Sequence, residues 1–296
     1  MITIKVPATS ANIGSGFDSC GMALSLYNTA AFEESNRIDI TSADGSFVPQ
    51  GEANLIYRTA KTVYEKCGKS LKGLKIVQTN PIPMARGLGS SSACIAAGIM
   101  GANELLGKPL SQKDILTLAT DIEGHPDNVA PALMGGFVVS AIDGGEVYSL
   151  KKTINDSICF AAFIPSFKLL TEKARAALPK EVSHKDAVYN LSRAALLATA
   201  FCQERYDLLS VASKDSLHQQ YRLPLIEGGQ EIFDLAKSLG ATAHFISGAG
   251  PTILAVVDAK DNAFFDKARA AISADEKMNK FDLQRFAPDN TGAVVI

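Results

Sequence analysis

Two periodicities in the hydrophobic residues divide the first half of the chain into strands and helices. Apolar and polar residues alternate over residues 2–6, as in a half-buried strand, and Pro7 is expected to end that strand. Small and polar residues fill 8–18, which predicts a loop. The remaining apolar runs predict strands at 22–32, 74–77, 135–142 and 146–150, and helices at 54–66, from about 90 to 106, and from 111 to 123.

The pattern restarts after a polar stretch at 151–156, which places a domain boundary near 150–157. A continuous apolar run at 158–164 then predicts a buried strand. Further along, the spacing predicts helices at 186–204, 208–219, 231–239 and 259–274, and strands at 242–246 and 253–257. The chain is therefore expected to be an α+β protein with two domains, residues 1–152 and 153–296.

Composition narrows the classes of function. The chain has 296 residues, of which 47% are hydrophobic and 20% charged, as in ordinary globular proteins. Its net charge of −2 and its lack of a basic cluster argue against a nucleic-acid partner. No apolar stretch approaches the roughly 18 residues of a membrane span, and no signal peptide is evident. We therefore expect a cytoplasmic protein with no membrane partner.

The cysteines do not suggest a metal site or a disulfide framework. The five of them are far apart, and none forms a C-x-x-C pair. Such a dispersed, odd-numbered set is typical of reduced thiols in an intracellular protein.

The first sign of chemistry is the stretch P-M-A-R-G-L-G-S-S-S-A at 83–93, which precedes an apolar helical run. Glycines let the backbone approach a ligand closely, serines add donors, and the first N–H groups of a helix attract anions. A phosphate site fits this layout; the alternative is a flexible turn with a serine cap on a buried helix. The loop contains no lysine, which disfavours a Walker-type P-loop.

Two further loops of small residues accompany this one. They read P-A-T-S-A-N-I-G-S-G-F-D-S-C-G at 7–21 and S-G-A-G-P-T at 247–252. In this order the three loops closely resemble those of the GHMP small-molecule kinases. The first loop, together with G-H-P-D-N-V-A-P-A at 124–132, is most similar to the branch of that family whose substrate is homoserine. The resemblance extends from residue 3 to beyond residue 250.

The resemblance implies both a fold and a reaction. The fold is a two-domain one, with an N-terminal ATP-binding domain (1–152) that contains a left-handed β-α-β unit and a sandwich-like C-terminal domain (153–296). The reaction is ATP-dependent phosphorylation of the side-chain hydroxyl of L-homoserine to O-phospho-L-homoserine and ADP, a step towards threonine. Many members of the family form dimers, so a homodimer is an expectation to test.

The resemblance also assigns residues to ATP and Mg²⁺. It places the metal, and with it the catalytic function, on Ser91 and Glu123, and such oxygen ligands suit a hard cation. Without the family, Glu123 would be taken for an exposed carboxylate at a helix end. The positions that match the ATP site are Asn54, Pro83, Met84, Ala85, Arg86, Gly87, Leu88, Gly89, Ser90, Ser91, Ser92, Ala93 and Cys94.

An amino-acid substrate needs partners for its ammonium and its carboxylate. Asp18 suits the ammonium, and a forked guanidinium suits the carboxylate. The resemblance implies that Arg193 and Arg222 are the two arginines that bind it. By their spacing alone, both arginines would be solvated helix residues. Arg175 belongs to a segment that faces the site in the family. The positions that match the substrate site are Asn12, Asp18, Asn128, Thr171, Arg193, Arg222, Gly248 and Gly250.

Two questions stay open at this stage. No general base is assigned, because Asp18 is committed to the ammonium, Asp127 lacks a clear role, and His125 fits a structural hydrogen bond equally well. The rival functions are a mevalonate- or sugar-type kinase of the same family and a non-catalytic ligand sensor. The presence of Ser90, Ser91 and Glu123 argues against the sensor.

Overall fold

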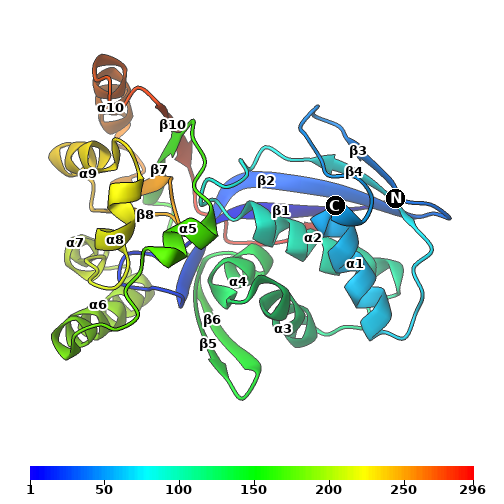
Figure 1. Ribbon diagram of the computed structural model, residues 1–296. Helices are drawn as coiled ribbons and strands as arrows, with labels where there is room; N and C mark the ends of the chain where they lie inside the picture. Colours follow the sequence, from blue (N-terminus) through cyan, green and yellow to red (C-terminus); the bar gives the residue numbers. More distant parts are fainter.

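A computed structural model describes residues 1–296, and it contains two β-sheets that lie in separate domains (Figure 1). The first sheet has the strand order β11-β1-β2-β4-β3, with β5 beside β2 and β6 beside β5. All of its pairs are antiparallel except β3 with β4. Its strands are β1 (Ile2–Ala11), β2 (Cys20–Glu34), β3 (Asp39–Ser42), β4 (Leu74–Thr79), β5 (Phe137–Asp143), β6 (Glu146–Lys152) and β11 (Val294–Val295).

Strand β1 does not end at Pro7, so that prediction is wrong. The pairing with β2 shifts register between Pro7 and Ala8, whose partners are Tyr27 and Leu24. Such a bulge accommodates a residue that cannot donate a ladder hydrogen bond. The strand then continues to Ala11. The first four residues of the expected loop, 8–11, are therefore strand, and this extension delivers the next residue, Asn12, to the site described below.

Four helices cover the first sheet. They are α1 (Leu55–Lys66), α2 (Ser90–Leu105), α3 (Gln112–Glu123) and α4 (Pro126–Met134). Helix α2 packs closely because a Cβ at Gly98 would lie 2.6 Å from the Ile56 carbonyl oxygen, and one at Gly101 would lie 2.6 Å from the ring of Phe32. The sequence predicted α1, α2 and α3. It did not predict α4, whose nine residues begin at one proline and contain a second, Pro131.

The second sheet has the order β10-β7-β9-β8 and is antiparallel throughout. All eight residues of β7 are buried, because alternate residues enter two different hydrophobic cores: Phe160 packs on one side and Phe163 on the other. The apolar run that predicted this strand thus reflects a sheet covered on both faces. The strands are β7 (Ile158–Pro165), β8 (Ala243–Ile246), β9 (Ile253–Asp258) and β10 (Phe281–Phe286), and the covering helices are α6 (His184–Cys202), α7 (Leu209–Ala212), α9 (Gly229–Ser238) and α10 (Asn262–Ala274).

The predicted helix at 208–219 is wrong, because the structure has two short helices there, α7 and α8 (Gln219–Arg222). The break is made by the side chain of Asp215, which is fully buried. Its carboxylate accepts hydrogen bonds from the backbone N–H groups of Leu217, His218 and Gln219 at 2.7–3.0 Å. Because it binds the backbone in this way, Asp215 ends one helix and starts the next. Strands β3 and β10 and helix α5 (Thr171–Ala176) were not predicted either.

The last residues of the chain return to the first sheet. Strand β11 pairs with β1, and Pro288 forms a bridge with Leu24 of β2. Asn290 exchanges two hydrogen bonds with the backbone of Ile154, at 2.8 and 2.9 Å. The predicted second domain, 153–296, thus includes a tail that completes the first domain. None of the helices combines the length and the apolar character needed to cross a membrane.

Candidate active site

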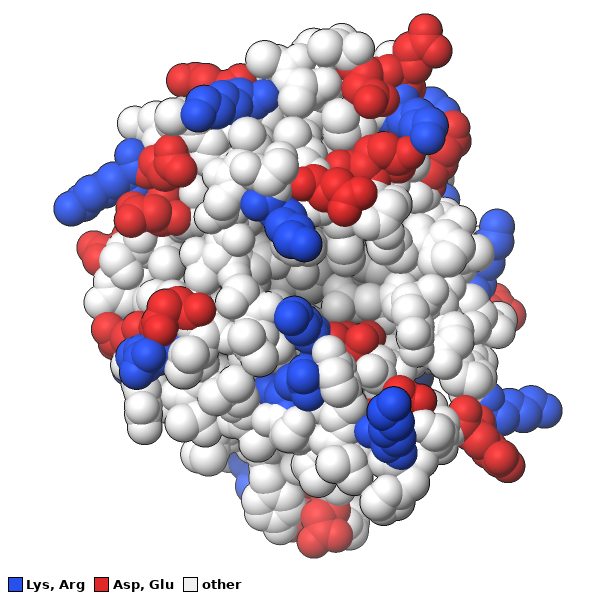
Figure 2. Space-filling model, turned by 90° about the vertical axis from the view of Figure 1, so that its left-hand side faces the viewer, with Lys and Arg blue, Asp and Glu red and all other residues white.

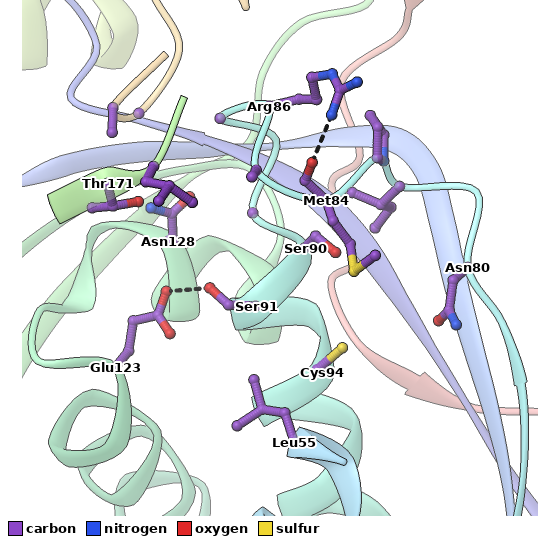
Figure 3. A pocket seen from close by; sticks show the side chains of 18 of the residues that line it. Leu55, Asn80, Met84, Arg86, Ser90, Ser91, Cys94, Glu123, Asn128 and Thr171 are labelled. Carbon is purple, nitrogen blue, oxygen red and sulfur yellow. Dashed lines mark hydrogen bonds between the residues drawn. The ribbon is translucent and has the colours of Figure 1, made fainter. Parts of the chain in front are cut away.

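All three loops singled out in the sequence meet at one cavity of about 620 Å³ (Figure 3). The first domain contributes Asn12, the 83–91 loop and the segment that joins α3 to α4. The second contributes α5, α8 and the 247–252 loop. The sequence-predicted residues that line the cavity are Asn12, Asn54, Pro83, Met84, Ala85, Arg86, Gly87, Gly89, Ser90, Ser91, Cys94, Glu123, Asn128, Thr171, Arg222 and Gly248.

Helix α2 begins at Ser90, so the last two residues of the 83–91 loop form its first turn. The glycines of the loop are held in left-handed conformations. Gly87 has φ +77° and Gly89, the N-cap, has φ +69°. A Cβ at Gly87 would lie 2.2 Å from the Ser247 carbonyl oxygen, and one at Gly89 would lie 1.9 Å from Thr9 Oγ1. The glycines therefore let the three loops pack against each other. The cavity lies at the start of α2, whose first N–H groups have no acceptor in the preceding turn and favour an anion.

We expect Gly87→Ala to lower the free energy of unfolding more than Gly107→Ala does. Both residues have positive φ, so both substitutions carry the same left-handed strain of about 1 kcal/mol. Gly107 has nothing within 4 Å of its Cβ position, whereas Gly87 faces backbone. Overpacking should add roughly 1–3 kcal/mol at Gly87, measured by urea denaturation. Equal losses in the two variants would show that the contact between the loops is loose.

Glu123 stands at the end of α3, opposite the serines of the loop. Its Oε1 accepts a hydrogen bond from Ser91 Oγ at 2.9 Å (Figure 3). It also accepts one from Ser92 Oγ at 2.8 Å. Ser91 and Glu123 line the cavity, whereas Ser92 is buried behind them. A carboxylate and a hydroxyl are oxygen ligands of the kind that hold Mg²⁺, the rest being phosphates and water. The residues present thus fit a magnesium ion.

Other residues of the predicted ATP site have structural partners. Arg86 donates to the carbonyl oxygens of Met84, Pro165 and Ser166 at 2.6–2.9 Å, so its guanidinium joins the loop to the end of β7. Asn54 caps α1 by accepting from the N–H of Tyr57. Burial raises the pKa of the Cys94 thiol to about 11, which keeps it neutral. Leu88 and Ala93 are buried in the core and do not line the cavity.

Asp18 lies near the other end of the cavity. Like Asn12 it has a positive φ, and its backbone N–H donates to Asn12 Oδ1 at 2.8 Å. Its carboxylate accepts from both terminal nitrogens of Arg175, each at 3.2 Å. The side chain of Asp18 is 34% exposed and that of Arg175 is 44% exposed, so solvent weakens the attraction between them. Arg175 itself lines the cavity.

Arg222 is a buried cation with no carboxylate partner. It is 1% exposed, and it donates to the carbonyl oxygens of Gly248 at 3.1 Å and Ala174 at 3.4 Å. No acidic group lies within ion-pairing distance. Burial, followed by the charge of Arg175, lowers the pKa of Arg222. A buried charge of this kind is costly unless it is paired. Because Arg222 lines the cavity, an anionic ligand would supply the missing partner.

Arg193 is not brought together with these residues. Its guanidinium carbon lies 3.2 Å from the centroid of the Tyr189 ring, and its NH1 donates to the Tyr189 carbonyl oxygen. Arg193, Gly250 and Asp18 do not line the cavity. Asp18 is nevertheless adjacent to it, because its carboxylate is paired with Arg175, which does line it. Arg175 was not among the predicted substrate-site residues, yet it lines the cavity. The available signal was its spacing four residues after Thr171, which places both on one face of α5.

His125 and Asp127 form a close pair at the start of α4. His125 Nδ1 lies 2.7 Å from Asp127 Oδ1, and Asp127 is buried with its second oxygen unpartnered. The hydrogen bond to Asp127 raises the pKa of His125 against the opposing effect of burial. His125 also lines the cavity. The pair therefore keeps an imidazole beside the cavity protonated over a wider pH range than an unpaired histidine would be.

We expect His125 to stabilise the fold at acidic pH. Because its folded-state pKa is raised, its contribution is complete below the unfolded value of about 6.5 and is lost as pH rises through the folded value. The free energy of unfolding of the wild type minus that of His125→Gln should thus be larger at pH 5.5 than at pH 8.5. His184→Gln, at the exposed start of α6, controls for loss of a histidine as such. A pH-independent difference would contradict the ion-pair assignment.

Comparison with known proteins agrees with this arrangement. Two family models match the chain: GHMP kinases N terminal domain over residues 54–136, and GHMP kinases C terminal over residues 197–274. Homoserine kinase of Clostridium beijerinckii is 46% identical over 100% of this chain and 99% of that protein. Homoserine kinase of Caldicellulosiruptor saccharolyticus is 45% identical, over 100% and 96%. The crystal structure of homoserine kinase from Cytophaga hutchinsonii superposes with a TM-score of 0.88 at 28% identity, over 100% and 97%.

The two-domain fold and the matched models define a GHMP kinase. Identity above 40% to curated relatives over the whole chain is more specific than that. The chain belongs to the homoserine kinase family.

Proposed function

We propose that the protein transfers the γ-phosphoryl group of ATP to the side-chain hydroxyl of L-homoserine, producing O-phospho-L-homoserine and ADP on the way to threonine. The observation that carries the proposal is the buried, unpaired Arg222 in the same cavity as the 83–91 loop. A substrate with a carboxylate would pair with this cation. Asp18 supplies the complementary charge for an ammonium. An amino acid satisfies both, whereas mevalonate has no ammonium and a neutral sugar has neither group.

The triphosphate is assigned to the start of α2. Its free N–H groups and the hydroxyls of Ser90 and Ser91 offer hydrogen bonds, and the helix dipole favours negative charge. Ser91 and Glu123 are proposed to hold Mg²⁺, which when bound supplies neutralisation of charge on the phosphates. Glu123 accepts the Ser91 and Ser92 hydroxyls, so the carboxylate is fixed in position before the nucleotide arrives.

Homoserine is assigned to the opposite end of the cavity. Arg222 and Arg175, rather than Arg193, are proposed to bind its carboxylate, because these two arginines line the cavity. Asp18 is proposed to bind its ammonium, assisted by Asn12. The homoserine end of the cavity is proposed to be completed by Asn128, Thr171 and Gly248. Asn128 Oδ1 accepts from Thr9 Oγ1 at 2.8 Å, which fixes the amide with its nitrogen free to bind a ligand.

Transfer is proposed to depend on position and charge more than on a base. In a loose transition state the acceptor hydroxyl needs little deprotonation before it attacks. The hydrogen bond to Asp127 raises the pKa of His125, which reduces the fraction of neutral imidazole that could accept a proton. We therefore assign the reaction no general base.

A coupled assay of ADP release with L-homoserine, mevalonate and galactose tests the proposal. Turnover is expected with homoserine alone. Turnover with mevalonate or galactose would favour another kinase of the same superfamily. Binding of homoserine without ADP release from any substrate would favour a non-catalytic sensor.

We propose further that the enzyme works in the cytoplasm as a homodimer. Five free cysteines suit a reducing compartment. Apolar side chains of α6 face solvent, with Leu191 70% exposed, and could be covered by a second copy. Sedimentation velocity would distinguish a dimer from a monomer.

A further inference from the structure

A second cavity, of about 880 Å³, lies in the C-terminal domain among α7, α8, α9 and β8. These elements lie on the side of the molecule that Figure 2 faces, where a hollow near the middle has both basic and acidic side chains around it. Residues that line the cavity include Lys214, Gln219, Lys237 and His244. None of them belongs to the active-site cavity described above.

The two lysines of this second cavity are unpaired, whereas its carboxylates are engaged. Lys214 and Lys237 have no carboxylate within ion-pairing distance in the structure. Asp215 accepts from three backbone N–H groups, and Glu231 is paired with Lys277 at 2.6 Å. The cavity therefore offers positive charge and has little capacity left to bind a cation.

Two less exposed side chains add unused hydrogen-bonding atoms. Gln219 is only 9% exposed; its Oε1 accepts from the Ile246 N–H at 2.9 Å, while its Nε2 has no partner in the protein. His244 Nδ1 is buried without a partner, whereas Gln219 Nε2 keeps access to solvent. A buried polar atom without a partner is uncommon in folded proteins. An anion would accept from both groups.

We propose that this cavity is a regulatory site for a small doubly charged anion, a phosphorylated or dicarboxylic metabolite, held by Lys214, Lys237 and Gln219. We also propose that its occupancy weakens homoserine binding in the active site. The second statement rests on the proposed function, whereas the first does not.

Helix α8 and the end of β8 connect the two cavities. Gln219 of α8 lines the second cavity, and Arg222, three residues later, lines the first. The hydrogen bond from Ile246 N–H to Gln219 holds α8 against the strand end. The next residue, Ser247, donates to the Gly87 carbonyl oxygen at 2.6 Å. A ligand that draws Gln219 towards itself would thus move the helix that carries Arg222.

Binding can be tested with the four histidines of the chain as reporters. In protein labelled with ¹⁵N-histidine, inorganic phosphate and, separately, succinate are titrated while the imidazole signals are followed. Burial and the charge of Lys237 lower the pKa of His244, so a bound anion should raise it and shift the His244 signal with saturation. A response to phosphate alone would identify a phosphorylated ligand, and a response to succinate a dicarboxylate.

The control is the double variant Lys214→Gln/Lys237→Gln, which changes two exposed side chains. In this variant the His244 shift should be lost while the fold, followed by circular dichroism, is kept. No saturable shift with either anion, or an equal shift in the double variant, would overturn the site. A shift at His125 alone would also overturn it, because it would place the anion in the first cavity.

Coupling is tested by kinetics with the anion that binds. Near saturation, the KM for homoserine should rise several-fold in the wild type and stay constant in the double variant, with the KM for ATP less affected. An anion that shifts His244 but leaves the homoserine KM unchanged would establish the site and overturn the coupling. Failure of the proposed function would be recognised separately, since the wild type would then show no turnover even without the anion.

Discussion

Replacing Glu123 by Gln should lower kcat by at least about 100-fold, the usual cost of removing one electrostatic contact to the transition state. The amide retains the size of the carboxylate and can still accept from Ser91 and Ser92. It lacks the charge proposed to hold Mg²⁺. The KM for homoserine should change little, because Asp18 and Arg222 are untouched. Initial rates measured over a range of Mg²⁺ concentrations provide the test.

The matched control for this substitution is Asp121→Asn. Asp121 is an exposed acid on the same helix, two residues earlier, and does not line the cavity. Its replacement should leave both kcat and the Mg²⁺ dependence unchanged. Normal turnover of Glu123→Gln at limiting Mg²⁺ would leave Glu123 as an acceptor for two serines and nothing more.

Asp18→Asn is expected to raise the KM for homoserine about 10- to 100-fold, with the KM for ATP unchanged. Asparagine adopts positive φ as readily as aspartate, so the backbone at +51° should persist. Loss of a buried charge partner costs about 2–5 kcal/mol, but Asp18 and Arg175 are both partly exposed, which reduces the expected effect. Steady-state kinetics with each substrate varied in turn give both constants.

Two arginine variants decide which side chains bind the carboxylate. Arg175→Gln should raise the homoserine KM, because Arg175 lines the cavity. Arg193→Gln should not, because its guanidinium lies on the Tyr189 ring. If Arg193→Gln alone weakened homoserine binding, the amino-acid end of the cavity would have to be reassigned. If both single variants, Asp18→Asn and Arg175→Gln, still bound homoserine normally, the amino-acid end of the cavity would also have to be reassigned.

Local signals predicted the parts of the fold that depend on short-range chemistry. The strand–loop–helix arrangement around 83–93 followed from its glycines, serines and apolar run, and the structure has α2 beginning at Ser90. The helix after Ser111 was predicted from its cap, and Ser111 does form a capping box with Asp114. The buried strand β7 was predicted from its continuous apolar residues.

Features that depend on distant partners could not be predicted in this way. Pro7 ends a strand by local rules, yet β2 shifts its register to accommodate it. Asp215 looks like any helix residue until its carboxylate is seen to bind three N–H groups. Arg175 and Arg193 are both arginines on helices, and only the position of those helices separates them. The second cavity has no motif at all, because its residues come from separate elements.

The pairing of β11 with β1 joins the two ends of the chain. During synthesis, β1 emerges from the ribosome long before β11. One edge of β1 therefore stays open until β11 has been synthesised, and open edges are where strands of different chains pair wrongly. The loop after β1, which carries Asn12, lacks a partner from the second domain until Gly248 has been synthesised, since Gly248 donates to the Ala11 carbonyl oxygen at 2.9 Å. A ribosome-bound fragment of this protein cannot have a finished binding site, however much of its first sheet has formed.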